Sequence, residues 1–165
     1  MRGCARLYIG LGGSATTDGG QGMMQALKNA GISDTQVSVR VLCDVTNPLY
    51  GENGSAYVFA PQKGATPEQV RLLDERLRNQ ATASPHPEMA HTPGAGAAGG
   101  LGFALMCYLH AELVSGIETV LECQKFDELL SDADLVFTGE GKTDKQTLMN
   151  KAPFGVLRHA MSRNI

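Results

Sequence analysis

A glycine-rich stretch at residues 9–22 (IGLGGSATTDGGQG) sets the first limit on the fold of this chain. It holds six glycines, three hydroxyl residues and one aspartate, and it follows a short apolar run at residues 7–9. Glycine accepts positive φ angles, and its missing Cβ lets the backbone approach a ligand closely. Successive backbone N–H groups in such a loop can bind anionic oxygen, helped by the positive end of a following helix. The stretch therefore indicates either a ligand-binding loop or a tight strand-to-helix connection capped by Asp18.

Two common phosphate-binding patterns fit the chain poorly. Residues 10–15 satisfy the dinucleotide pattern, with Ala15 in its last position. That pattern also needs an acid at the end of a second strand, whereas Asp34 precedes the next apolar run. Residues 139–143 (GEGKT) resemble the end of a P-loop, but Val136 stands where the first glycine is required. A nicotinamide-dependent dehydrogenase stays open as an alternative, and the P-loop is excluded.

Composition places the chain among globular proteins of about one domain. Its 165 residues are 42% hydrophobic and 19% charged, which is ordinary for such proteins. The net charge of −3, without a cluster of lysines and arginines, argues against a nucleic-acid partner. No apolar run is long enough to cross a membrane. The four cysteines are widely spaced, which favours reduced thiols in a cytoplasmic protein over a disulfide framework.

The periodicity of the apolar residues predicts alternating strands and helices. The expected elements are a strand over residues 37–42 and helices over residues 21–30, 67–79, 101–112 and 115–130. The clearest helix start combines Thr66 as cap, Pro67 in the first position and Gln69 as the partner in a capping box. The apolar residues 55–59 receive no assignment.

A second glycine cluster at residues 93–102 opens the helix expected from residue 101. Small residues at a helix start allow either close packing against other backbone or the approach of a ligand to the helix N-terminus. The sequence favours neither interpretation over the other.

Acidic residues follow two apolar runs that we expect to be strands. Asp44 comes directly after the strand at residues 37–42, where α/β proteins often bind ligands, although it could equally cap the turn before Pro48. Residues 135–137 are expected to form a buried strand, with Glu140 in a glycine loop after it and a helix from Pro153. A strand, an acidic glycine loop and a helix make half of a parallel α/β unit.

Five motifs together resemble one family, the class I glycerate kinases. They are residues 9–20 (IGLGGSATTDGG), 43–49 (CDVTNPL), 59–66 (FAPQKGAT), 93–100 (PGAGAAGG) and 135–141 (LVFTGEG), the last extended by Asp144, Gln146 and residues 151–153. Five motifs in the order of the family are far more specific than one glycine loop. The resemblance covers nearly the whole chain.

The resemblance implies the fold class and its division. These kinases have a Rossmann-like domain into which a second α/β domain is inserted. Residues 1–134 are similar to that second, mixed α/β domain, and residues 135–165 to the beginning of the returning Rossmann-like parallel α/β unit. The family's N-terminal Asp-Ser-Phe-Lys segment and its last strands are absent, so we expect an incomplete form. An unpaired edge at residues 135–137 would favour association between copies of the chain.

The resemblance also implies a reaction, in which the γ-phosphoryl group of ATP is transferred to a hydroxyl of glycerate, typically giving 2-phosphoglycerate. Such a transfer needs positioning, a cation and an acid or base near the attacking hydroxyl. ATP and Mg²⁺ are therefore expected, with glycerate as the small-molecule partner, and neither nucleic acid nor membrane is expected. A non-catalytic remnant or binding domain of the family is the alternative.

The candidate site residues lie in the shared motifs. The carboxylates that could accept a proton or bind Mg²⁺ are Asp18, Asp44, Glu140 and Asp144, with Asp18 and Glu140 as the metal candidates. The positions expected to contact substrate or nucleotide are Gly12, Gly13, Ser14, Thr16, Gly19, Gly20, Asn47, Lys63, Gly94, Gly96, Gly99, Gly100, Gly139 and Gly141.

Overall fold

In the computed structural model the chain divides into two units, one from Met1 to Leu113 and the other from Val114 to Ile165. The structure describes residues 4–32, 37–140 and 152–165. No helix within these ranges has the length and apolar character needed to cross a lipid bilayer. The sequence predicts a division between two family domains after residue 134. That division refers to the domains of the whole family, and it stays a prediction.

The first unit contains a sheet of three strands in the order β1-β2-β3. The strands are β1 (Arg6–Gly10), β2 (Ser38–Leu42) and β3 (Glu112–Val114). β1 and β2 are parallel, with Tyr8 opposite Arg40. Helix α1 (Gln21–Asn29) connects them, as parallel strands require a crossover. The predicted strand at residues 37–42 and the predicted helix at residues 21–30 are therefore confirmed.

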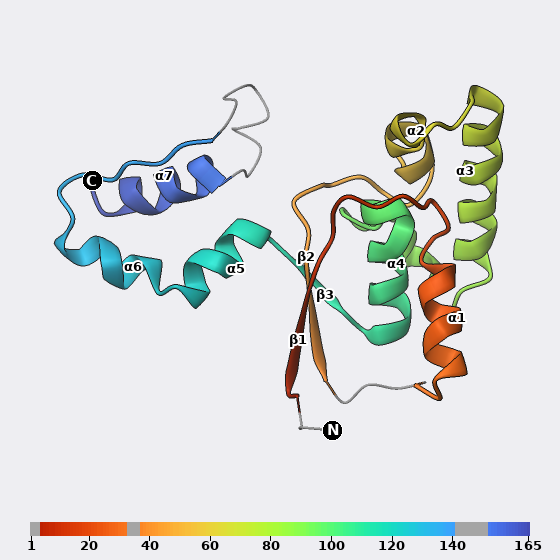
Figure 1. Cartoon of the computed structure of the whole chain (residues 1–165), viewed down its shortest axis with the longest axis horizontal. Coiled ribbons are helices and arrows are strands. Elements are labelled where there is room, and N and C mark those ends of the chain that lie inside the picture. The colour runs from red at the N-terminus through yellow and green to blue at the C-terminus, as the bar shows by residue number, and fades with distance from the viewer. Residues whose placement is uncertain (1–3, 33–36, 141–151) are drawn as a thin grey trace. The chain divides into compact units, whose positions relative to one another are not determined.

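Helix α4 is the centre of the first unit (Figure 1). It spans Ala97–Leu109, and it packs near α2 (Ser55–Phe59) and α3 (Pro67–Thr82). Residues 102–107 of α4 are all buried, and a helix that is apolar on every side belongs inside a core. Leu105 packs with Val41 of the sheet. Phe103 packs in a second cluster with Leu77 of α3, so α4 joins the sheet to the helices α2 and α3.

Three sequence expectations for the first unit change in detail. Residues 55–59, left unassigned, form the short helix α2. The helix expected to reach residue 112 ends at Leu109, because His110 adopts a left-handed backbone with φ 51°. Glu112 therefore belongs to β3. The helix predicted from the capping box is confirmed, and both bonds of the box between Thr66 and Gln69 are present.

The second unit is built from α5 (Gly116–Cys123), α6 (Phe126–Leu129) and α7 (Ala152–Ser162). The single helix expected over residues 115–130 is wrong. It breaks at Lys125, whose φ of 52° lies in the left-handed region that a continuous right-handed helix cannot contain. Ser115 does cap α5, and its Oγ accepts the Glu118 backbone N–H at 3.5 Å.

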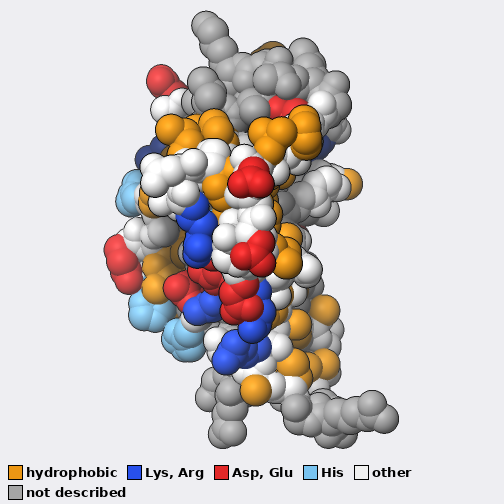
Figure 2. Space-filling model, turned by 90° about the vertical axis from the view of Figure 1, so that its left-hand side faces the viewer, with side chains coloured by type: hydrophobic (Ala, Val, Ile, Leu, Met, Phe, Trp, Pro, Cys, Tyr) orange, Lys and Arg blue, Asp and Glu red, His pale blue; other side chains and the backbone are white. Residues whose placement is uncertain are grey.

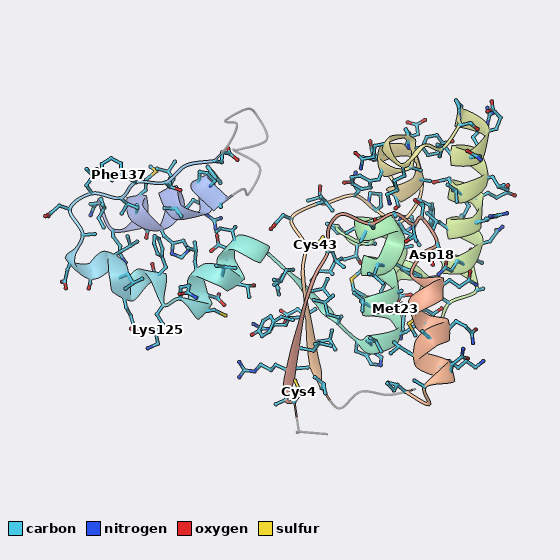
Figure 3. The ribbon with its side chains drawn as sticks, viewed as in Figure 1. Cys4, Asp18, Met23, Cys43, Lys125 and Phe137 are labelled. Carbon is cyan, nitrogen blue, oxygen red and sulfur yellow. The ribbon has the colours of Figure 1, made fainter. Side chains whose placement is uncertain are left out.

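The buried strand expected at residues 135–137 is not formed. Leu135 is 68% exposed and Phe137 is 88% exposed, and the Phe137 side chain projects outward from the segment that passes α7 (Figure 3). A strand needs partners for its backbone N–H and C=O groups, and the described part of the second unit offers no strand to pair with. Orange apolar groups lie at the surface beside charged side chains in Figure 2.

A charged cluster joins α5, α6 and α7. His159 of α7 lies between two carboxylates, with its Nδ1 at 2.9 Å from Asp127 and its Nε2 at 3.0 Å from Glu118. Arg158 pairs with Glu118, and Arg163 lies 3.6 Å from Asp127. The two carboxylates raise the pKa of His159, mainly through their hydrogen bonds, and His159 in turn lowers the pKa of each.

Candidate functional site

The glycine-rich loop leaves β1 and passes over the start of α4 before it enters α1 (Figure 1). Its glycines serve two different purposes. A Cβ added at Gly12 or Gly13 would meet nothing within 4 Å, so packing leaves the backbone open at these two positions. Gly13 also has a φ of 59°, which few other residues adopt. A Cβ at Gly19 would instead overlap Gln80, and one at Gly20 would overlap Ala104.

Asp18 caps the start of α1 (Figure 3). One carboxylate oxygen accepts the Gly20 backbone N–H at 3.1 Å, and the other accepts the Gly22 backbone N–H at 2.9 Å. The first N–H groups of a helix need such acceptors. Asp18 also lines a cavity of about 720 Å³ together with Thr17 and Gln80. The capping interpretation of the sequence is therefore confirmed, and a role for Asp18 in catalysis stays a prediction.

Lys63 connects the glycine-rich loop to the short 3-10 turn Pro61–Lys63. Its ammonium donates to the Ser14 hydroxyl at 2.9 Å and to the Thr16 carbonyl at 2.6 Å. Burial lowers the pKa of Lys63, and the negative charge of Asp18 partly opposes that shift. The structure thus brings Ser14, Thr16 and Lys63, which are three predicted contact residues, together with the charge of Asp18.

A cavity of about 190 Å³ lies at this junction. Its lining includes Gly12, Gly13, Ser14 and Lys63, with Gly99 from the second glycine cluster. Open backbone, a hydroxyl and a partly buried cation are groups that bind anionic oxygen. The arrangement fits a phosphate group better than an apolar ligand.

The second glycine cluster packs directly against the loops around the cavity. A Cβ at Gly99 would overlap the Thr16 carbonyl, and one at Gly100 would lie 2.8 Å from the Gly19 Cα. The Gly19 N–H donates to the Gly99 carbonyl at 2.9 Å. Ala98 shares the left-handed backbone of the two following glycines. Close packing therefore explains these positions, and direct ligand contact at them stays a prediction.

The first half of this cluster holds the turn after β2 in the same manner. A Cβ at Gly96 would overlap the Pro48 carbonyl, and one at Gly94 would lie 2.8 Å from Leu113 and 3.0 Å from the Cys43 sulfur. The Gly96 N–H donates to the Asn47 carbonyl at 2.9 Å.

Asn47 and Asp44 belong to the turn after β2. The Asn47 side-chain amide donates to the Asn53 carbonyl at 2.8 Å, so this side chain holds its own turn in place. Asp44 is exposed. Burial raises the pKa of the neighbouring Cys43 thiol, and the negative charge of Asp44 adds to that rise.

The remaining predicted residues belong to the second unit or lie outside the described residues. Glu140 is half-buried and Gly139 is exposed at the end of the segment after α6. Gly141 and Asp144 lie outside the described residues. Whether Glu140 faces the same cleft as Asp18 stays a prediction.

Sequence reasoning missed Asp74, a buried carboxylate on α3. Its Oδ1 accepts the Gly51 N–H at 2.7 Å, and its Oδ2 lies 3.6 Å from Arg78, whose guanidinium stacks 4.5 Å from the centre of the Tyr50 ring. This contact ties the turn that carries Asn47 to α3. The helical spacing contained the signal, because Asp74 falls on the same face as the inward residues of α3.

Comparisons with known proteins agree with this architecture. The family model described as Glycerate kinase family matches residues 1–36 and 29–165. A glycerate kinase of Halalkalibacterium halodurans is 44% identical over 96% of this chain and 50% of its own length. Glycerate 2-kinase of Escherichia coli is 42% identical over 93% of this chain and 48% of its own length.

A solved structure leads to the same family. The structure of glycerate kinase 2 from Salmonella typhimurium LT2 aligns with a TM-score of 0.81 at 38% identity, over 97% of this chain and 51% of that chain. The chain thus spans about half the length of the relatives it matches. The mixed α/β fold expected from the motifs is confirmed, and the structure shows that it contains a small parallel sheet. The chain belongs to the glycerate kinase family.

Proposed function

We propose that this chain carries the phosphate-binding part of a glycerate kinase site, in which the γ-phosphoryl group of ATP is transferred to a hydroxyl of glycerate to give 2-phosphoglycerate. Family membership supports the reaction, and one relative bears the name glycerate 2-kinase. Within the molecule, one observation carries the proposal. The Lys63 ammonium is bound to Ser14 and Thr16 beside the open backbone of Gly12 and Gly13.

Lys63 keeps the capacity to bind an anion. An ammonium group has three donors, and Ser14 and Thr16 accept two of them. The third donor is available to a phosphate oxygen in the cavity of about 190 Å³. Phosphoryl transfer depends mainly on positioning and on neutralising charge. A cation fixed against a glycine loop supplies both.

Carboxylates of the family motifs fit Mg²⁺ in the usual manner of ATP-dependent enzymes. Mg²⁺ takes oxygen ligands, usually one or two carboxylates together with phosphate oxygens and water. Within the described residues there is no cluster of three or more His, Cys, Asp or Glu side chains suited to a metal ion. When bound, Mg²⁺ would neutralise charge on the phosphate groups. Asp18, Asp44, Glu140 and Asp144 remain the candidate carboxylates for proton acceptance or for Mg²⁺, with Asp18 and Glu140 as the metal candidates among them.

A cytoplasmic location is part of the proposal. ATP is supplied there, and none of the four cysteines forms a disulfide bond, as is usual in a reducing compartment.

Binding and turnover test the function separately. The chain is titrated with glycerate and with a non-hydrolysable ATP analogue plus Mg²⁺, using calorimetry. Turnover is followed by coupled ADP release in a chimera, in which this sequence replaces the matching half of the Escherichia coli enzyme. We expect the chain to bind both ligands and the chimera to phosphorylate glycerate. If the chain fails to bind glycerate, or fails to bind the ATP analogue with Mg²⁺, the proposal is contradicted.

The same experiment decides between the alternatives. A non-catalytic binding domain predicts binding by the chain and an inactive chimera, and the half-length match to the relatives keeps this alternative open. A nicotinamide-dependent dehydrogenase predicts binding of NAD, which is titrated in parallel. The family assignment favours the kinase over the dehydrogenase.

A further inference from the structure

A third cavity, of about 410 Å³, adjoins the glycine-rich loop at Lys63. Lys63 lines both this cavity and the cavity of about 190 Å³ that contains the open glycines. The lining of the cavity of about 410 Å³ also includes Thr17, Gln69 and Arg76. Among the described residues that line it, two are cations and none is acidic. In a chain with a net charge of −3, such a cavity selects for an anionic ligand.

Arg76 differs from the other arginines of α3. Arg71 pairs with Glu68 at 3.6 Å, and Arg78 pairs with Asp74 at 3.6 Å. In the described parts of the chain, the side chain of Arg76 forms neither an ion pair nor a hydrogen bond. Its guanidinium therefore keeps all its donors for a ligand.

The geometry points to Arg76 as the residue that binds the carboxylate of the acceptor substrate. This inference rests on the proposed function, and it names the end of glycerate that the cavity of about 410 Å³ receives. A guanidinium presents its donors as a planar fork that matches the two oxygens of a carboxylate. Lys63, which is shared by both cavities, then lies where the acceptor meets the phosphate group. Arg76 would make the site select hydroxy acids over neutral polyols.

Arg76→Gln tests the assignment, with glycerate, glycerol and the non-hydrolysable ATP analogue as probes. Glycerol keeps the hydroxyl groups of glycerate and lacks its carboxylate. We expect the affinity of the chain for glycerate to fall roughly 10-fold to 100-fold, as for the loss of a charge-assisted hydrogen bond. Binding of glycerol and of the nucleotide analogue should stay within about twofold, which is well under one hydrogen bond. Arg76→Lys keeps the positive charge but loses the planar fork of donors. Its affinity for glycerate should therefore lie between that of the unsubstituted chain and that of Arg76→Gln.

Arg71→Gln is the matched control, because Arg71 lies exposed on the same helix and is paired with Glu68. It should leave all three affinities unchanged. Arg76 is exposed, so its replacement should leave the thermal midpoint unchanged.

Each result has a distinct meaning. Unchanged glycerate binding in Arg76→Gln overturns the inference and leaves the proposed function standing. A loss confined to the nucleotide analogue also overturns it, because the anion held is then a phosphate. Lactate, a hydroxy acid titrated in parallel, separates the two proposals. If the unsubstituted chain binds lactate through Arg76 but binds no glycerate, the carboxylate site stands and the proposed function fails. Absence of binding to any carboxylate overturns both.

Discussion

At Asp18, both carboxylate oxygens accept backbone N–H groups at the start of α1, and the same residue lines a cavity of about 720 Å³. A substitution there acts on the stability of the helix as well as on the site. The two effects can be separated by measuring them in different molecules. Stability is measured on this chain, and turnover is measured on the chimera with the Escherichia coli enzyme.

Asp18→Asn should weaken both properties by different amounts. The asparagine oxygen can replace one capping acceptor, whereas its NH₂ group faces a second N–H donor. We expect the free energy of unfolding of the chain to fall by about 1 kcal/mol, measured by urea denaturation. In the chimera, turnover should fall at least roughly 100-fold, as for a residue that handles a proton or a metal ion.

Asp132→Asn is the control for this variant, because Asp132 is exposed in the second unit. It should change neither quantity. Near-normal turnover in a folded Asp18→Asn chimera would show that Asp18 caps α1 and has no role in catalysis.

The two kinds of glycine around the cavity should respond differently to substitution by alanine, because only one kind is packed against other atoms. Gly99→Ala places a Cβ against the Thr16 carbonyl at a φ of 74°, so it should lower the free energy of unfolding by roughly 1–3 kcal/mol. Gly12→Ala meets nothing within 4 Å and should leave stability unchanged within about 0.5 kcal/mol. If a phosphate group approaches the loop backbone, Gly12→Ala should still weaken binding of the ATP analogue. Chemical denaturation and calorimetry measure the two responses, and equal destabilisation by both variants would contradict this division.

At the scale of elements, local signals predicted what local interactions decide. The capping box at Thr66 and Gln69 is satisfied within four residues, so the start of α3 could be predicted from the sequence. The break at Lys125 could not, because nothing in its side chain requires the left-handed backbone that it adopts. The strand expected at residues 135–137 failed for another reason, since strands depend on partners distant in the sequence.

The same distinction holds for the site. The motifs named Ser14, Thr16 and Lys63 as contact residues, although no local pattern showed that the Lys63 ammonium donates to both of the others. The role of Gly99 and Gly100 in packing against residues 16–19 appears only in three dimensions. The bond between Asp74 and the Gly51 backbone likewise appears only in three dimensions, because the two residues lie 23 positions apart in the sequence.

The cluster around His159 predicts that the docking of α7 depends on pH. The groups that face His159 are Glu118 on α5 and Asp127 on α6, and Arg158 and Arg163 flank them. The pKa of His159 is raised in the folded state, so its contribution to stability is complete below the unfolded pKa and disappears as pH rises through the folded pKa. The pKa values of Glu118 and Asp127 are lowered, so their contribution is lost as pH falls through those values.

Amide hydrogen exchange across α7 measures this dependence. Protection should be greatest in weakly acidic solution, above the ordinary carboxyl range and below that of imidazole, and it should fall on the alkaline side. His159→Gln should remove the alkaline loss. An unchanged alkaline loss in this variant would assign the titration to another group. His110→Gln is the control, because His110 is exposed and belongs to the first unit.

At the scale of the whole molecule, the chain spans about half the length of its relatives. The second unit exposes several large apolar side chains, which are Leu129, Leu135, Phe137 and Met161. Soluble proteins seldom leave such side chains without a covering surface. Exposed apolar side chains of this size favour association between copies of the chain.

A polypeptide of these 165 residues should therefore bind ligands more readily than it turns them over, and it should associate with itself. Catalysis requires nucleotide and acceptor to be held together, because positioning supplies much of the rate. We expect little ADP release with glycerate, compared with the Escherichia coli relative under the same conditions. Light scattering during size-exclusion chromatography should show species larger than a monomer, and Phe137→Lys should reduce them by charging the exposed segment. Leu72→Lys is the control, since Leu72 is exposed on α3 of the first unit. Turnover by the chain comparable with that of the Escherichia coli enzyme would show that this half of the family fold is sufficient for catalysis.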